Sequence, residues 1–339
     1  MTLPQRHQNR LALLLGLGLV LASALLLLLG VSVGSTGFES LRNMQHDPQA
    51  MQIIWEIRLP RTAGAWLAGA LLGLAGAVAQ GLFRNPLADP YLLGSASGAS
   101  LGVAGAMVLF GVSPLATHWV ARIGLTGAAF LGAVGAVLLT LLLAKGVQHT
   151  LRLLLAGVVV GVVLGAVTSL LLLLTPDILQ AMQSFMLGST AFVGWTACGV
   201  MAGTLFLSLV GAWMLNHVLD GLALGEATAQ SLGLRLPQMR AALVVVLALA
   251  TGTAVAQTGL VAFVGLAAPH LVRSVVKTTH GRLILLASLM GAVLLMAADI
   301  LARWLTAPQE LPVGVLTAVL GGGYLLWLMQ RHTGRGAGL

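Results

Sequence analysis

Long apolar runs recur along the whole chain, and few polar residues interrupt them. Neither 11–36 nor 62–82 contains a charged side chain. A helix needs about 20 apolar residues to cross the hydrocarbon core of a bilayer, and only helices or closed barrels satisfy their backbone groups there. Barrel strands would alternate apolar and polar residues over about 10 positions, which these evenly apolar runs do not. The pattern therefore predicts an all-α polytopic membrane protein.

Charges, prolines and glycines divide the apolar runs into ten predicted transmembrane helices. Their predicted ranges are 11–34, 62–82, 91–112, 121–143, 151–174, 193–216, 239–258, 260–276, 282–303 and 312–330. The first run follows Arg6 and Arg10, as the apolar part of a signal peptide would. It is too long for that role, no small-residue cleavage site closes it, and further spans follow. We therefore predict that it is the first transmembrane helix.

The basic residues predict the orientation of these spans. With the N-terminus in the cytoplasm, twelve of them face the cytoplasm: Arg6, Arg10, Arg84, Lys145, Arg152, Arg235, Arg240, Arg273, Lys277, Arg282, Arg331 and Arg335. The other five then face outward: Arg42, Arg58, Arg61, Arg122 and Arg303. Because cytoplasmic loops carry the excess of Lys and Arg, we predict that both termini are cytoplasmic.

The composition supports this class and excludes others. Charged residues make up 8% of the 339 residues, against about a quarter in soluble domains, and the mean hydropathy is +0.99. The net charge is +8, but the basic residues are scattered at helix ends, so we expect no nucleic-acid partner. Cys198 is the single cysteine of the sequence, which excludes a disulfide framework and a cysteine-based metal site.

Sequence motifs for catalysis are absent. The sequence contains no phosphate-binding loop, no His-Glu-x-x-His zinc motif and no Gly-x-Ser-x-Gly elbow, so we expect neither an enzyme nor a metal site. Asp299 is the only acid in its predicted span, which disfavours an intramembrane protease. The spans are almost free of charge at their centres, unlike those of proton- or sodium-coupled carriers. We infer that the driving energy is supplied from outside the chain.

Glycines recur at helical spacing within two predicted spans. They are Gly69, Gly73 and Gly76 in the second span, and Gly94, Gly98, Gly102 and Gly105 in the third. Small residues at every third or fourth position let membrane helices approach closely. We interpret the spacing as packing within one bundle; a dimer seam or a smooth pore wall would show the same spacing.

Two short sequences occur twice, 177 residues apart in both cases. Arg-Leu-Pro stands at 58–60 and 235–237, and Ala-Val-Ala-Gln stands at 77–80 and 254–257. In the predicted topology the helix after the first copy runs inward, and the helix after the second runs outward. Similar halves of opposite direction indicate an inverted repeat, which is typical of transporters, although a channel could share it. We predict one transmembrane permease domain over 1–339, with halves at about 58–190 and 235–330 and a cytoplasmic segment at 220–233.

Three groups of segments together resemble the FecCD-type permeases of ABC importers for iron chelates, haem and vitamin B12. They are Arg-Leu-Pro-Arg (58–61) with Phe-Arg-Asn-Pro-Leu-Ala-Asp-Pro (83–90); Asp-Gly-Leu-Ala-Leu-Gly-Glu-Ala-Thr-Ala-Gln-Ser-Leu-Gly (220–233); and Phe-Val-Gly-Leu (263–266) and Pro-His (269–270) with Ala-Asp-Ile-Leu-Ala-Arg (298–303) and Glu-Leu-Pro-Val-Gly (310–314). The resemblance extends from about residue 50 to the end, and the combination of segments is specific.

The resemblance implies a permease subunit of an ATP-driven importer in the bacterial inner membrane. Such subunits have ten helices and pair as homodimers, which bind two ATPase subunits and a periplasmic substrate-binding protein. ATP and Mg would bind to the ATPase, so we expect no cofactor in this chain. The expected cargo is an iron chelate, haem above all, moved into the cytoplasm by alternating access. A siderophore or cobalamin permease is the alternative within the family; a self-contained channel or secondary carrier is the alternative from another class.

Three arginines on the predicted outer face match the docking residues of the family. In family members the arginines matching Arg58, Arg61 and Arg303 receive acidic residues of the binding protein, and guanidinium groups pair well with carboxylates. Alternatively, Arg303 pairs with Asp299 one helical turn before it, and the other two anchor the membrane interface.

The cytoplasmic segment 220–233 resembles the coupling helix that the family inserts into a groove of the ATPase. The matching residues are Asp220, Leu224, Gly225, Glu226, Ala229, Leu232 and Gly233. The apolar spacing predicts a helix, and Gly233 suits its C-terminal cap. A plain connecting loop is the alternative. We expect Trp in place of Gly225 or Ala229 to abolish transport without loss of folded protein.

The segment after the second predicted span matches the border of the cytoplasmic gate in the family. Its matching residues are Asn85, Pro86 and Leu87. Proline disfavours helical conformation in the residue before it, so a structural turn explains them equally well.

A short outer helix is predicted to begin at 175–177, because Pro176 is preset for a first helical turn. The residues after it match the external gate and pathway of the family: Met182, Phe185, Met186 and Gly188. Flexible methionines adapt to bulky ligands, but they also fill ordinary cores. His217 and His270 are isolated in the sequence, so we interpret them as helix-end histidines and not as metal or haem ligands.

Overall fold

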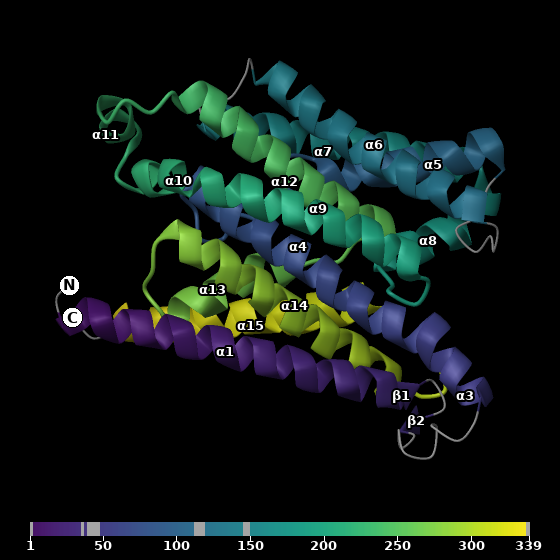
Figure 1. Ribbon diagram of the computed structural model, residues 1–339. Coiled ribbons are helices and arrows are strands. Elements are labelled where there is room, and N and C mark those ends of the chain that lie inside the picture. Colours follow the sequence, from purple (N-terminus) through teal and green to yellow (C-terminus); the bar gives the residue numbers. More distant parts are fainter. Residues whose placement is uncertain (1–2, 35–36, 39–47, 112–118, 145–149, 337–339) are drawn as a thin grey trace.

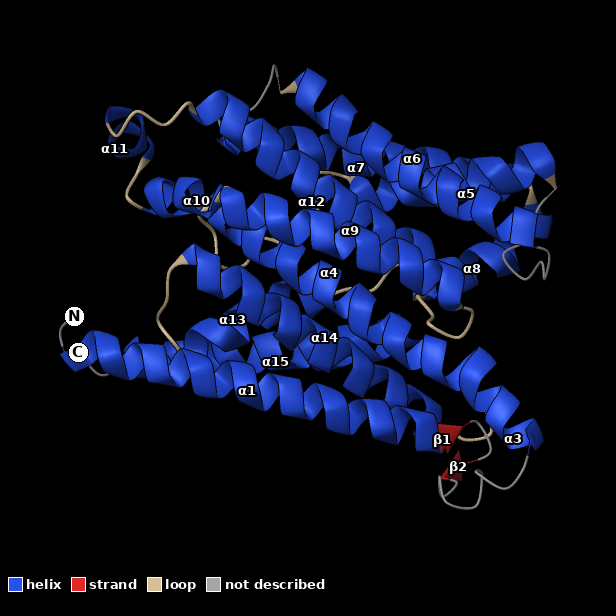
Figure 2. Ribbon diagram, viewed as in Figure 1, coloured by secondary structure: helices blue, strands red, loops and turns tan. Residues whose placement is uncertain are grey.

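Nearly all described residues lie in helices that run along one bundle (Figures 1 and 2). The computed structural model describes residues 3–34, 37–38, 48–111, 119–144 and 150–336. Within these residues the only strands are β1 (Val33–Gly34) and β2 (Gly37–Phe38), which pair antiparallel at one end of the bundle. The predicted all-α class is confirmed.

Each of the ten predicted spans coincides with a helix, although α1 begins eight residues before its predicted start at 11 and α15 ends six residues after its predicted end at 330. They are α1 (Leu3–Ser32), α4 (Leu59–Phe83), α5 (Ser95–Phe110), α6 (Trp119–Leu143), α7 (Thr150–Leu174), α9 (Trp195–Met214), α12 (Leu236–Thr258), α13 (Val264–Val275), α14 (His280–Trp304) and α15 (Val313–Gly336). Shorter elements are α3 (Pro48–Ile53), the π-helix η1 (Ile54–Arg58), the 3-10 helix η2 (Pro176–Ile178), α8 (Leu179–Leu187), α10 (Asn216–Ala223) and α11 (Glu226–Ser231).

Seven helical stretches among the described residues are long and apolar enough to cross a membrane. The apolar helices Ser95–Phe110 and Val313–Leu326 are shorter, and α13 has only 12 residues. The predicted span 260–276 starts late because Gly259 and Phe263, both with φ of 68°, interrupt the helix before Val264. The full ten-span topology therefore stays a prediction.

The two ends of the bundle carry different elements. Helix α1 begins and α15 ends beside the end that carries α10 and α11, whereas α3, the two strands and α8 lie at the opposite end (Figure 1). We call these the α11 end and the α8 end. Helix α4 runs from the α8 end to the α11 end, and α12 runs in the opposite direction (Figure 1). Both begin with Leu-Pro, so this pair has the opposed directions that an inverted repeat requires.

Helix α4 forms the centre of the bundle, and glycines bring its backbone against two neighbours. A methyl group at Gly69 would lie 2.3 Å from the carbonyl oxygen of Gly291 in α14, and one at Gly76 would lie 1.7 Å from that of Gly265 in α13. Gly73 is equally close to the backbone of α14. Only glycine permits these approaches, which confirms close packing for the glycines of the second span.

A second glycine contact joins α5 to α6. A methyl group at Gly98 would lie 2.2 Å from the carbonyl oxygen of Gly132, and Gly102 is as close to the next turn of α6. Two other glycines of the predicted stripe differ: Gly94 precedes α5 with φ of 81°, and a methyl group at Gly105 would have no neighbouring atom within 4 Å. Close packing is therefore confirmed for two of the four glycines in this span.

Candidate functional site

A buried carboxylate at the α8 end holds two arginines. Asp299 of α14 is fully buried, and its Oδ1 lies 3.1 Å from Nε and from Nη2 of Arg61 in α4. Its Oδ2 lies 2.8 Å from Nη2 of Arg303, one helical turn further along α14. The hydroxyl of Thr190, between α8 and α9, donates a hydrogen bond to the same carboxylate. Asp299 thus connects α4, α14 and the segment that follows α8.

The other donors of these arginines also have partners within the chain. Nη1 of Arg61 lies 2.8 Å and 3.0 Å from the two carboxylate oxygens of Glu310, between α14 and α15. Nη1 of Arg303 donates to two backbone carbonyls near the end of α1, at 2.9 Å and 3.0 Å. Arg58 donates to a third carbonyl there, at 3.3 Å. The three predicted docking residues therefore lie at one end of the bundle, around the end of α1.

These arginines are much more enclosed than the sequence suggested. Arg58 is 9% exposed, Arg61 8% and Arg303 1%. The ion pair of Arg303 with Asp299, stated above as the alternative, is present. Docking through these arginines stays a prediction, and it would require an exchange of their present partners. Glu310 was missed as a partner, although it begins the Glu-Leu-Pro-Val-Gly motif.

The predicted coupling segment consists of two helices instead of one. Helix α10 ends at Ala223, and Gly225, with φ of 108°, separates it from α11. Residues with a side chain rarely adopt this positive φ, which glycine tolerates. The break was not predicted because the apolar residues on both sides of Gly225 keep a helical spacing. Gly233, with φ of 82°, follows α11 as the predicted C-terminal cap. Leu224 and Leu232 are 68% and 63% exposed, and they flank α11.

Two residues of this segment, Ala229 and Asp220, contact the rest of the protein. Ala229 is fully buried against the core, so the expectation that Ala229→Trp leaves the fold intact is wrong: a large ring has no space there. Asp220 accepts two hydrogen bonds from His280 at the start of α14, from the backbone NH at 3.0 Å and from Nδ1 at 2.7 Å. Asp220 therefore connects α10 to α14.

Glu226 connects α11 to two long helices. Its Oε1 lies 2.6 Å from Nη2 of Arg240 in α12 and 3.7 Å from Nη2 of Arg84, which ends α4. Arg240 is 3% exposed, whereas 43% of the Arg84 side chain is exposed. The sequence did not indicate either ion pair. Glu226 is more than 100 residues from Arg84, and it lies in a different helix from Arg240.

The predicted cytoplasmic gate residues form an exposed turn at the α11 end. Helix α4 ends at Phe83, and Arg84 adopts a left-handed conformation with φ of 50°. Oδ1 of Asn85 accepts a hydrogen bond from the backbone NH of Leu87 at 2.9 Å. The helix thus ends before Pro86, and the structural-turn alternative describes this segment; a gating role stays a prediction.

The predicted short outer helix is present as η2 and α8. Met182 is fully buried in a core cluster, whereas Met186 is 47% exposed. The backbone carbonyl of Phe185 accepts a hydrogen bond from the NH of Leu260, at 3.1 Å. Gly188 has φ of 70°, and a methyl group on it would meet the carbonyl of Leu260 at 2.4 Å. Met182 therefore belongs to the core, and only Met186 of the two methionines could contact a passing ligand.

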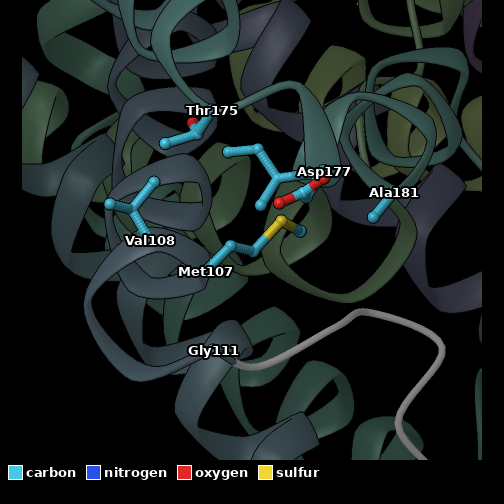
Figure 3. A pocket seen from close by; sticks show the side chains of 7 residues that line it. Met107, Val108, Gly111, Thr175, Asp177 and Ala181 are labelled. Atoms are coloured by element: carbon cyan, nitrogen blue, oxygen red, sulfur yellow. The ribbon is translucent and has the colours of Figure 1, made fainter.

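A cavity of about 350 Å³ lies between α5 and η2 at the α8 end (Figure 3). Its lining residues are Met107, Val108, Gly111, Thr175, Asp177, Ile178 and Ala181. No sequence pattern indicated this cavity, because its walls come from segments about 65 residues apart.

Neither His217 nor His270 lies in an arrangement typical of a metal centre. The ring of His270 packs edge-on against Tyr324 of α15, with the ring centroids 5.9 Å apart. His217 lies at the start of α10, where it is exposed. Across the described residues, no group of three His, Cys, Asp or Glu side chains is placed to hold a metal ion.

Seven described helical stretches are long and apolar enough to cross a membrane, and they pack in one bundle, as in an integral membrane protein. The chain belongs to the FecCD transport family, whose family model matches residues 18–331. It is therefore a permease subunit of an ABC importer.

Known proteins resemble the chain over most of its length. It is 38% identical over 331 residues to HmuU, the hemin transport system permease protein of Yersinia pestis; the alignment covers 93% of this chain and 96% of HmuU. It is 39% identical over 282 residues to BtuC, the vitamin B12 import system permease protein of Salmonella paratyphi A, covering 82% and 83%. A solved metal-chelate type ABC transporter in an inward-facing conformation has a TM-score of 0.84 at 29% identity, covering 93% and 98%.

Proposed function

We propose that this permease imports haem across the bacterial inner membrane, from periplasm to cytoplasm. Two copies form a homodimer around a central pathway, and each copy crosses the membrane ten times with both termini in the cytoplasm. Two separate ATPase subunits bind ATP and Mg and drive alternating access of the pathway. A periplasmic binding protein delivers the cargo at the α8 end.

The observation that carries the haem assignment is the extent of the similarity to HmuU. The alignment covers 96% of HmuU but 83% of BtuC, at nearly the same identity. A siderophore or cobalamin permease would share the same fold, so a transport assay must decide between the cargoes.

That assay uses proteoliposomes containing the permease with its ATPase and binding protein. We expect ATP-dependent, vanadate-sensitive uptake of haem that exceeds uptake of a ferric siderophore or cobalamin. Selective uptake of cobalamin or siderophore would contradict the haem assignment. Uptake by the permease alone, without ATPase, would support a channel or secondary carrier instead.

We propose further that the whole chain is one transmembrane domain built from halves at about 58–190 and 235–330. The opposed directions of α4 and α12, which carry the two copies of the repeated sequence, support this division. Gln80 and Gln257 occupy matching positions near the ends of these helices.

The ATPase contact is proposed at α11, with Leu224 and Leu232 as the apolar side chains that enter its groove. Both are more than 60% exposed at a cytoplasmic connection, where no lipid would cover them. Replacing both with Ala should reduce co-purification of the ATPase, because a helix in a groove binds through such apolar anchors. Leu109→Ala, at a leucine 77% exposed on the α8 end, is the matched control. Unchanged co-purification in the double variant would contradict this contact.

Binding-protein docking is proposed at the arginine cluster of the α8 end. Acidic residues of the binding protein would compete with the present partners of Arg58 and Arg61. Arg58→Glu should weaken association and reduce its dependence on salt concentration. Arg235→Glu, at an exposed arginine of the α11 end, serves as the control. Association of the Arg58 variant at wild-type strength would contradict docking there.

A further inference from the structure

Helix α11 has few contacts of its own that could fix its position. It contains six residues, and Ala229 is the one that is buried. On either side, Gly225 and Gly233 have positive φ, and no atom lies within 4 Å of a methyl position at Gly233. Backbone joints of this kind let a short helix turn relative to its neighbours. The position of α11 therefore depends strongly on its ion pairs with the rest of the protein.

One side chain of α11 supplies such ion pairs in two directions. Glu226 Oε1 is 2.6 Å from Nη2 of the buried Arg240 and 3.7 Å from Nη2 of the half-exposed Arg84. A buried charge needs its partner more than an exposed one, because water cannot replace that partner. The contact with Arg240 is thus the anchor, and the longer contact with Arg84 is the one that a small displacement can make or break.

The two arginines lie at the ends of two long helices that meet α11. Arg240 lies in the first turns of α12, and Arg84 ends α4 and begins the exposed turn 84–87. The same carboxylate therefore reaches the start of α12 and the end of α4. These are the two helices that carry the repeated Arg-Leu-Pro and Ala-Val-Ala-Gln sequences.

We propose that Glu226 is the positioning residue that transmits movement of α11 to the cytoplasmic ends of α4 and α12. The inference rests on the proposed ATPase contact at α11. Movement of α11 carries the Glu226 carboxylate, which holds Arg240 and changes its distance to Arg84. The turn 84–87 then moves together with the Arg84 side chain as the distance between Arg84 and Glu226 changes. In this arrangement the ion pairs, and not the backbone joints, convert movement of the ATPase into movement of α4.

The test measures the cargo transported per ATP hydrolysed by the complete transporter in proteoliposomes. Glu226→Gln keeps the size of the side chain and removes its charge; we expect the ratio to fall by about threefold to thirtyfold, the range of a coupling network that loses one member. Glu56→Gln, an exposed glutamate near the start of α4, should leave the ratio unchanged.

A second variant covers the case in which Glu226→Gln fails to fold because Arg240 loses its ion pair with Glu226. Arg84→Gln leaves no buried charge and should lower the same ratio, while Arg84→Lys should restore it. Arg235→Gln is the matched control at the α11 end.

A distance measurement separates transmission from a merely structural role. Spin labels at the exposed Gln230 and Leu87, in a Cys198→Ser background, report the position of α11 relative to the turn. We expect ATP to shift this distance in the wild type, and expect no correlated shift in Arg84→Gln. A folded Glu226→Gln or Arg84→Gln transporter with the wild-type ratio and the wild-type shift would overturn the inference. A wild-type chain that binds no ATPase would overturn the proposed function, and this inference with it.

Discussion

The substitution Gly76→Ala tests the packing at the centre of the bundle most directly. A methyl group at this position of α4 would lie 1.7 Å from the carbonyl oxygen of Gly265, 2.5 Å from its carbonyl carbon and 3.0 Å from its Cα. All three are backbone atoms of α13, so no side-chain rotation can relieve the overlap. Ordinary van der Waals contact begins at 3.4 Å. The two helices would therefore have to separate by more than an ångström at this crossing.

The magnitude follows from two opposing effects. Overpacking a close contact costs about 1–3 kcal/mol, and the depth of this overlap places the cost near the upper value. Alanine in place of glycine within a helix contributes about 0.5–1 kcal/mol of stability through reduced backbone freedom. We therefore expect Gly76→Ala to destabilise the protein by roughly 2 kcal/mol.

The assay is chemical unfolding of the purified permease in mixed micelles, with thermal loss of monodispersity as a second readout. Gly105→Ala in α5 is the control, because a methyl group there would have no atom within 4 Å. At that position only the helix propensity acts, so stability should stay equal or rise by up to about 1 kcal/mol. If Gly76→Ala were as stable as Gly105→Ala, backbone contact between α4 and α13 would be refuted.

Two further predictions concern the arginine cluster. Asp299→Asn should lower the free energy of unfolding by about 3–5 kcal/mol, because two buried arginines lose their common counter-charge; Asp177→Asn in the exposed η2 should change it by less than about 0.5 kcal/mol in the same unfolding assay. Glu310→Gln should cost at most about 1 kcal/mol, since that carboxylate is partly exposed. It should also strengthen association of the binding protein, measured by titration at several salt concentrations, because Arg61 then lacks one internal competitor; weaker association would contradict docking at Arg61.

The positions of the helices could be predicted from the sequence because membrane helices are set by local composition. Apolar runs located each long helix, with the largest boundary errors at the start of α1 and the end of α15, and Pro176 correctly indicated the start of η2. The pair of Asp299 and Arg303 was also accessible, because it joins residues one turn apart.

Features that depend on tertiary structure were not predictable in this way. The partnership of Arg61 with Asp299 spans 238 residues, and no local pattern reports it. The break at Gly225 was hidden because apolar residues on both sides keep a helical spacing, whereas the φ of 108° depends on how α10 and α11 pack. Likewise, the inward orientation of Ala229 follows from the fold and not from its size.

The glycine contacts of α4 also restrict how the sequence of this protein can diverge. Where Gly69 and Gly73 meet Gly291, each residue occupies the space that a side chain on the opposite helix would need. A larger residue on one helix cannot be compensated by a smaller residue on the opposite helix, because the opposite residue is already glycine. These pairs should therefore stay fixed together, without compensating exchanges, while the largely exposed surfaces of α1 and α7 accept almost any apolar residue. In an alignment of relatives, the most constrained contacts of the bundle would then show no covariation, because neither residue of the pair varies.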